Sequence, residues 1–292
     1  MAKKKRASPK KGKPGREAPP KSAAPKPRAP AAIARAPEPA AAPPEAPSAP
    51  PEAPAGLQGR LGAAERMLAS GDLAGAERAW TELSLDAPGS SHAWHGLGLV
   101  ALRRGDHPRA VELVNKAARL APSDARLHAN LGAVLRAAGR LGEAVSAYRR
   151  SLELRPRHPA TLAALAATLT RGGQVALEGS KLPAAERAFR AALALEPEQP
   201  DALHGLGMVA LKARKAKAAQ QLLGRALLAA RKRRAPPAAL AVALAHYGQA
   251  LRQLGEPAKA AAAYRESLKL AANDQVARWL TEVEGLKQDP RA

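Results

Sequence analysis

The chain has 292 residues, a formal net charge of +22, only 2% aromatic residues and no cysteine. So few aromatic side chains cannot fill one large globular core, and the lack of cysteine excludes disulfides, thiolate metal sites and a cysteine nucleophile. Because no run approaches the ~18 apolar residues needed to span a bilayer, we expect a soluble, cytoplasmic protein.

Residues 1–56 are predicted to form a disordered tail. They hold 15 of the 27 prolines of the chain, and Ile33 is their one large apolar side chain available for burial. Residues 1–36 carry 12 lysines and arginines against Glu17 alone, whereas residues 37–56 carry three glutamates and no base. The first part is therefore a basic tail, and the second is an extended spacer.

A period of 34 residues begins near Leu57 and is clearest in units 91–124 and 125–158. Numbered from 1 to 34, both units have glycine at positions 8 and 15, alanine at 20 and proline at 32. Small residues at positions 8 and 20 allow two paired helices to approach closely. Glycine at 15 ends the first helix, and proline at 32 prevents the second from continuing. Each unit is therefore predicted to be a helix, a turn and a second helix.

The other units follow in order, with two insertions. Unit 57–90 comes first, and unit 159–199 has seven extra residues that extend its first helix over about 159–178, through Gly172-Gly173. Unit 200–233 has the ordinary length, whereas unit 234–274 again has a seven-residue extension. Finally, apolar residues at helical spacing predict a capping helix at about 275–287.

These recurrences resemble the tetratricopeptide repeat (TPR) family, through W-x-x-L-G from Trp94 to Gly98 and the small residues at fixed positions over residues 57–274. The resemblance implies an all-α solenoid, a right-handed superhelix of helix–turn–helix repeats. It also implies a concave partner groove lined by first helices at positions 2, 5, 9 and 12. The candidate groove residues are His92, His95, Leu99, Leu102, Arg126, Arg136, Gln174, His204, Met208, Leu211, Gln249 and Arg252.

Four of these candidates are apolar and could contact a hydrophobic peptide or helix. The alternative is that they pack against neighbouring first helices. The four are Leu99, Leu102, Met208 and Leu211.

Residues 202–255 hold ten bases and no acid. This segment is either a solvated face of a basic protein or a docking patch for an acidic protein segment, RNA or DNA, whose binding would weaken steeply with salt. The candidate basic patch comprises Lys212, Arg214, Lys215, Lys217, Arg225, Arg231, Lys232, Arg233 and Arg234.

Patterns that would indicate catalysis or a cofactor are lacking. His92 and His95 are three residues apart on one predicted helix, but no third metal ligand accompanies them. Neither a phosphate-binding loop nor a nucleophile elbow occurs. Asn130 matches one position of the carboxylate clamp of co-chaperone TPR proteins, but His95 and Leu99 stand where that clamp needs Lys and Asn, so Asn130 is given no role.

The leading hypothesis is a non-catalytic adaptor, without cofactor or metal, that binds a partner peptide or helix in the groove and attaches electrostatically through its tail. The alternative is a nucleic-acid- or ribosome-associated protein that uses the tail and the patch at 212–234. The sequence does not identify the partner.

Overall fold

The computed structural model describes residues 56–286, which form helices without a strand among them. The predicted tail lies outside the described residues except for Gly56, and so does the end of the predicted capping helix. The helices are α1 (Leu57–Ser70), α2 (Leu73–Asp86), α3 (Ser91–Arg103), α4 (His107–Leu120), α5 (Ala125–Ala137), α6 (Leu141–Leu154), α7 (Pro159–Glu178), α8 (Leu182–Leu195), α9 (Pro200–Lys212), α10 (Ala216–Lys232), α11 (Pro237–Gln253), α12 (Pro257–Leu270) and α13 (Asp274–Leu286).

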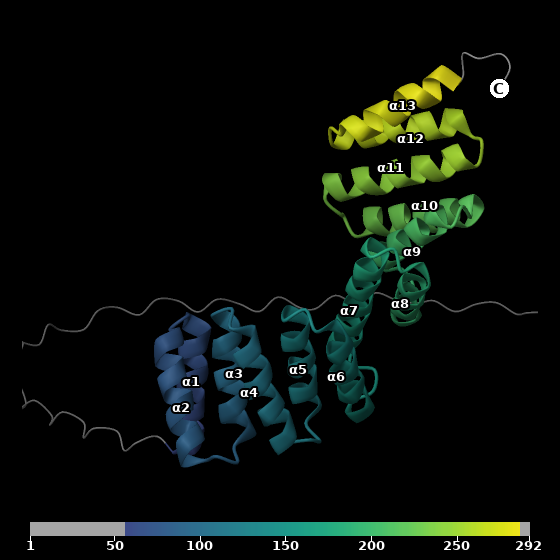
Figure 1. Cartoon of the computed structure of the whole chain (residues 1–292). Coiled ribbons are helices and arrows are strands. Elements are labelled where there is room, and N and C mark those ends of the chain that lie inside the picture. The colour runs from purple at the N-terminus through teal and green to yellow at the C-terminus, as the bar shows by residue number, and fades with distance from the viewer. Residues whose placement is uncertain (1–55, 287–292) are drawn as a thin grey trace, which may run out of the picture. The chain divides into compact units, whose positions relative to one another are not determined.

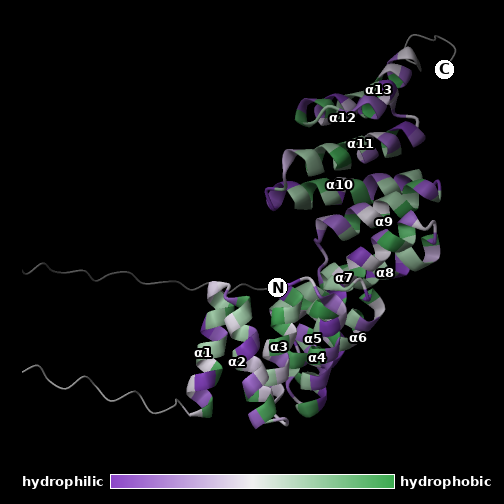
Figure 2. Ribbon diagram, turned by 60° about the vertical axis from the view of Figure 1, so that its left-hand side comes forward, coloured by the Kyte–Doolittle hydropathy of each residue, from purple (hydrophilic) through white to green (hydrophobic). Residues whose placement is uncertain are grey.

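The helices pack in chain order as hairpins, α1 with α2 through α11 with α12, and α13 packs on α12 (Figure 1). Each hairpin also contacts the next one along the chain. Figure 2 shows that the helices carry both hydrophobic and hydrophilic residues. Because each hairpin buries its apolar stripe against its neighbours, the core is a series of local clusters, and few aromatic residues suffice.

Close helix contact within each hairpin depends on the small residue at position 8. A Cβ atom added to Gly132 would lie 2.8 Å from the ring of Tyr148, which occupies position 24 of the same unit. Gly173 faces Phe189 in the same way, and Gly248 faces Tyr264. The large residue at position 24 therefore occupies the space that a side chain at position 8 would need.

The turn inside each hairpin requires a left-handed backbone conformation at position 15. Glycine supplies it in four units, with φ between 74° and 87°. Ser180 and Arg214 occupy the equivalent position in two later units, with φ of 57° and 55°. A side chain in this conformation costs roughly 1–2 kcal/mol, so the fold tolerates local strain at these two turns.

The two seven-residue insertions lengthen helices. α7 is a single helix of 20 residues that continues through Gly172-Gly173. The second insertion is shared between α10 and α11, each of which has 17 residues. No helix in the described part of the chain is long and apolar enough to cross a membrane.

Candidate functional site

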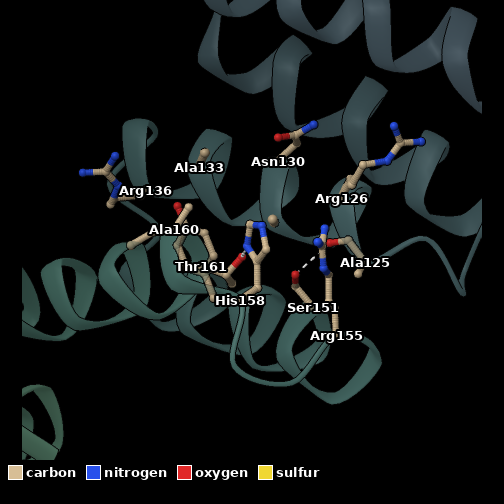
Figure 3. Close-up of a pocket in the computed structure, with 13 residues that line it drawn as sticks. Ala125, Arg126, Asn130, Ala133, Arg136, Ser151, Arg155, His158, Ala160 and Thr161 are labelled. Carbon is tan, nitrogen blue, oxygen red and sulfur yellow. Dashed lines mark hydrogen bonds between the residues drawn. The ribbon is translucent and has the colours of Figure 1, made fainter. Parts of the chain in front are cut away.

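A pocket of about 510 Å³ opens between α5 and α7, and Tyr148 and Ser151 of α6 also line it (Figure 3). Helix α5 forms one wall, and the connection from α6 into α7 forms the other. Alanines from both first helices leave the space between these walls unfilled. The lining residues are Ala125, Arg126, Ala129, Asn130, Ala133, Arg136, Tyr148, Ser151, Arg155, His158, Ala160, Thr161 and Ala164.

The periodicity of α5 explains which of its side chains reach the pocket. Arg126, Ala129, Ala133 and Arg136 occupy positions 2, 5, 9 and 12, and helical spacing puts them on one face. The structure therefore brings the two predicted groove arginines of this unit to one pocket. The alanines between them present little side-chain volume.

Two hydrogen bonds fix the opposite wall. The Ser151 hydroxyl donates to the backbone carbonyl of Ala125 over 2.7 Å and so connects α6 to the start of α5. His158 Nδ1 lies 2.9 Å from the hydroxyl oxygen of Thr161, at the beginning of α7 (Figure 3). These contacts order the segment that carries Arg155 and His158.

The charged lining of this pocket is entirely basic, with three arginines and no carboxylate. Arg126 forms an ion pair with Asp124 at 3.1 Å, and the hydrogen bond from Arg126 holds the pKa of Asp124 below its usual value. Arg136 and Arg155 form no ion pair within residues 56–286. Burial raises the pKa of the Tyr148 phenol above its usual value, and the nearby Arg136 guanidinium only partly offsets this rise. Arg136 and Arg155, at opposite ends of the pocket (Figure 3), are thus the two lining arginines without a carboxylate partner among the described residues.

Asn130 links this wall to the preceding unit. Its side-chain nitrogen lies 2.8 Å from His95 Nε2, across from α5 to α3. Burial, followed by the charges of His92 and Arg126, lowers the pKa of His95, so the neutral imidazole can accept a hydrogen bond from the Asn130 amide. The sequence interpretation gave Asn130 no role, and this hydrogen bond between units is a contact that it did not foresee.

Three of the four apolar candidates are partly buried, and the fourth, Leu211, is buried. Leu99 and Leu102 pack against the clusters around α3, and Met208 packs beside Leu211. Leu211 is only 6% exposed because it lies in the core with Leu223 and Ala250. The prediction of Leu211 as a contact surface is therefore wrong.

The remaining groove candidates are dispersed along the first helices. His92 is exposed, whereas Gln174 and Gln249 are half-buried. Arg252 is paired with Glu282 of α13 at 2.6 Å. His204 Nε2 lies 2.8 Å from His246 Nδ1, which joins α9 to α11. None of these residues lines the α5–α7 pocket.

Two more pockets lie later in the array. One of about 550 Å³ lies between α9 and α11 and includes Asp201, His204 and Arg233 in its lining. Another of about 260 Å³ lies between α11 and α13 and includes His246 and Trp279. Within residues 56–286, no group of three or more residues that could hold a metal ion occurs.

The predicted basic patch does not form one free cationic surface. Arg231, Lys232 and Arg233 pair with Glu266, Glu198 and Glu196, respectively, so neighbouring units neutralise them. Arg225 donates to the carbonyl of Pro197 over 3.3 Å. The bases that remain exposed and without an ion pair within residues 56–286 include four around the α9–α10 turn, namely Lys212, Arg214, Lys215 and Lys217.

The sequence and the structure were also compared with known proteins. Sequence profiles of the tetratricopeptide repeat match residues 61–125 and 170–239, 125–158, and 241–274. A TPR repeat-containing protein of Pseudomonas aeruginosa is 44% identical over 66 residues, which are 22% of this chain and 27% of that protein. The chain therefore matches about a quarter of the length of this curated relative.

Two solved structures that match the chain do so at low sequence identity. The APC/C hetero-tetramer Cut9-Hcn1 matches with 19% identity and a TM-score of 0.44, over 80% of this chain and 44% of that chain. YrrB, described as a TPR protein with an unusual peptide-binding site, matches with 15% identity and a TM-score of 0.50, over 71% of this chain and 100% of that chain. At such identities the likeness concerns the fold alone.

Proposed function

The chain belongs to the tetratricopeptide repeat family, a scaffold for protein–protein interaction, and on that premise we propose that it is a non-catalytic adaptor that binds a segment of a partner protein between its first helices. The observation that carries this proposal is the α5–α7 pocket. It is concave, its floor is built from alanines, and its rim carries polar groups that could orient a ligand.

We divide the array into six units, 57–90, 91–124, 125–158, 159–199, 200–233 and 234–274, followed by a capping helix. The packing of α13 supports the cap. Val276 and Val283 of α13 are buried in one cluster with Tyr264, and the Trp279 ring lies 5.9 Å from the Tyr264 ring, centre to centre. In this division the pocket lies between the third and fourth first helices, within the array.

Peptide binding is stated for YrrB in the description of its structure. We extend it to this chain because the pocket lies between first helices and has a rim suited to an extended segment. Contacts with the partner backbone and with one or two of its side chains would supply affinity. The partner itself is not identified by the fold.

Association with a nucleic acid or the ribosome is a second candidate function. The exposed bases around the α9–α10 turn favour it, because they form no ion pair within residues 56–286. The pairing of Arg231, Lys232 and Arg233 with glutamates counts against a larger cationic face. We therefore rank this function below peptide binding.

Filling the pocket tests the leading proposal. Peptides would be selected by display on the full-length chain, and their affinities for Ala160→Trp and Ala163→Trp variants would be measured by fluorescence anisotropy. Both alanines are exposed on α7, but only Ala160 lines the pocket. We expect Ala160→Trp to weaken binding by at least about tenfold and Ala163→Trp to leave it unchanged. Failure to select any peptide, or equal effects of the two substitutions, would refute the proposal.

A further inference from the structure

We propose that the partner segment bound in the α5–α7 pocket is extended and carries two acidic side chains, about four or six residues apart, one for each end of the pocket. This inference rests on the proposed function and specifies the chemistry and the spacing of the segment. It is carried by the positions of Arg136 and Arg155, which form no ion pair within residues 56–286.

The two arginines mark opposite ends of the pocket (Figure 3). Arg136 lies in the last turn of α5, close to the Tyr148 phenol. Arg155 follows the end of α6 and lies beside Ala125, the first residue of α5. A rise of 1.5 Å per residue from Ala125 to Arg136 puts these ends about 16 Å apart along α5. Each arginine therefore needs a carboxylate of its own.

The floor between the two ends is lined by small side chains. Ala129 and Ala133 come from α5, whereas Ala160 and Ala164 come from the first two turns of α7, the helix that the first insertion lengthens. An extended backbone can lie along such a floor, and it advances about 3.3 Å per residue, so the pocket spans about five residues. Side chains an even number of residues apart point to the same face, which favours a separation of about four or six.

Unopposed positive charge distinguishes this pocket from the two that lie later in the array. Its charged lining is three arginines, of which Arg126 is paired with Asp124. The α9–α11 pocket has Asp201 and one arginine, Arg233, which is paired with Glu196. The α11–α13 pocket has no Lys, Arg, Asp or Glu in its lining. Among these three pockets, two acidic side chains are therefore complementary in charge to the α5–α7 pocket alone.

The same pocket is poorly suited to a nucleic acid strand. Proteins that hold single strands stack bases on accessible aromatic rings. The aromatic ring in this lining belongs to Tyr148, which is only 2% exposed because it packs against Gly132. An alanine floor with one cation at each end fits a peptide with spaced acids better than a row of phosphates and bases.

Single substitutions at each end of the pocket test this arrangement in the full-length chain. The probes are a peptide selected by display, with blocked termini so that its only carboxylates are side chains, and two counterparts in which one acid at a time becomes its amide. Each probe is titrated by fluorescence anisotropy against Arg136→Gln, Arg155→Gln and the control Arg149→Gln. Arg149 is exposed on α6, lines none of these three pockets and removes the same charge. The tail charge is common to every protein and cancels in the comparison.

We expect each amide replacement to weaken binding to the wild-type chain by at least about threefold. One of the two replacements should lose its effect in Arg136→Gln and the other in Arg155→Gln, because each carboxylate contacts one arginine. Arg149→Gln should keep both effects. Moving the two acids to a separation of about two residues should remove the benefit of the second acid, which then cannot reach the far end.

A non-specific attraction would give a different result. The inference is overturned if either pocket substitution reduces both acid effects equally, or if Arg149→Gln does the same. It is also overturned if the selected peptides lack a pair of acids at this spacing. A labelled oligothymidylate that binds through both arginines more tightly than the peptide would overturn it as well, in favour of a nucleic acid ligand.

The outcome separates this inference from the function on which it rests. Peptides without paired acids whose binding is weakened by Ala160→Trp, but not by Ala163→Trp, would leave the adaptor function standing and remove the two acidic anchors alone.

Discussion

Adjacent glycines in α7 provide a direct test of how closely the hairpins pack. A Cβ atom added to Gly173 would lie 2.7 Å from the Phe189 ring, whereas one added to Gly172 would meet nothing within 4 Å. Phe189 has no exposed surface, and a Cβ atom on Gly205 of α9 would lie 2.3 Å from the same ring. The ring therefore lies against the backbones of both α7 and α9, and it cannot move away from a methyl group added at Gly173.

Gly172→Ala should leave the protein more stable than Gly173→Ala does. Alanine gains about 1 kcal/mol over glycine within a helix, and this gain is common to both positions. Overpacking a confined core costs about 1–3 kcal/mol, and this cost applies only at position 173. Gly172→Ala should therefore stabilise the protein by about 0.5–1 kcal/mol. Gly173→Ala should range from neutral to about 2 kcal/mol less stable than wild type.

Urea unfolding, followed by far-ultraviolet circular dichroism, would measure both variants. Because repeat arrays can unfold in stages, the midpoint of helix loss should be compared between variants at one protein concentration. A Phe189→Leu background should reduce the penalty at Gly173, since the smaller side chain makes room. Equal shifts for Gly172→Ala and Gly173→Ala would refute the packing argument.

Three further predictions concern charge and backbone strain. Burial, followed by the charge of His204, lowers the pKa of His246 to about 4 from 6.5, so the unfolded chain binds the proton more tightly. Stability should consequently fall as pH drops from 6.5 towards 4, by up to about 1.4 kcal/mol per pH unit, and urea midpoints at several pH values should show a flatter dependence for His246→Gln. Arg214→Gly should stabilise the chain by about 0.5–1 kcal/mol in thermal unfolding, because it relieves a positive φ at some entropic cost. Arg233→Ala should cost about 0.2–1 kcal/mol, less at high salt, since its ion pair with Glu196 is partly exposed, and a urea midpoint that falls further would contradict this.

The repeat period allowed much of the fold to be predicted from the sequence. Small residues at position 8 indicated close helix pairing, and the structure shows Gly132 against Tyr148 and Gly173 against Phe189. The recurrence is informative because the two helices of every hairpin have to approach each other equally closely, which requires a small residue at position 8 each time. Helix continuity through Gly172-Gly173 was harder to predict, since glycine weakens a helix and tertiary packing decides the outcome.

The candidate site was only partly predictable. Arg126 and Arg136 were found because they occupy first-helix positions, but Arg155 and His158 lie outside those positions, near the end of the unit. The ion partners of the basic patch were missed because they come from neighbouring units. The hydrogen bonds of Arg231, Lys232 and Arg233 to their glutamates span 34 to 37 residues, so the neutralising acids lie about one repeat away in the sequence.

The packing of Phe189 between Gly173 and Gly205 means that one hairpin is completed by the next one along the chain. At the end of the array, Trp279 of α13 takes the place of that next hairpin over Tyr264. A gene that gained or lost a unit would keep every aromatic ring covered if the change fell before α13. Such an array can vary in length by internal duplication, provided that α13 still packs on its final hairpin.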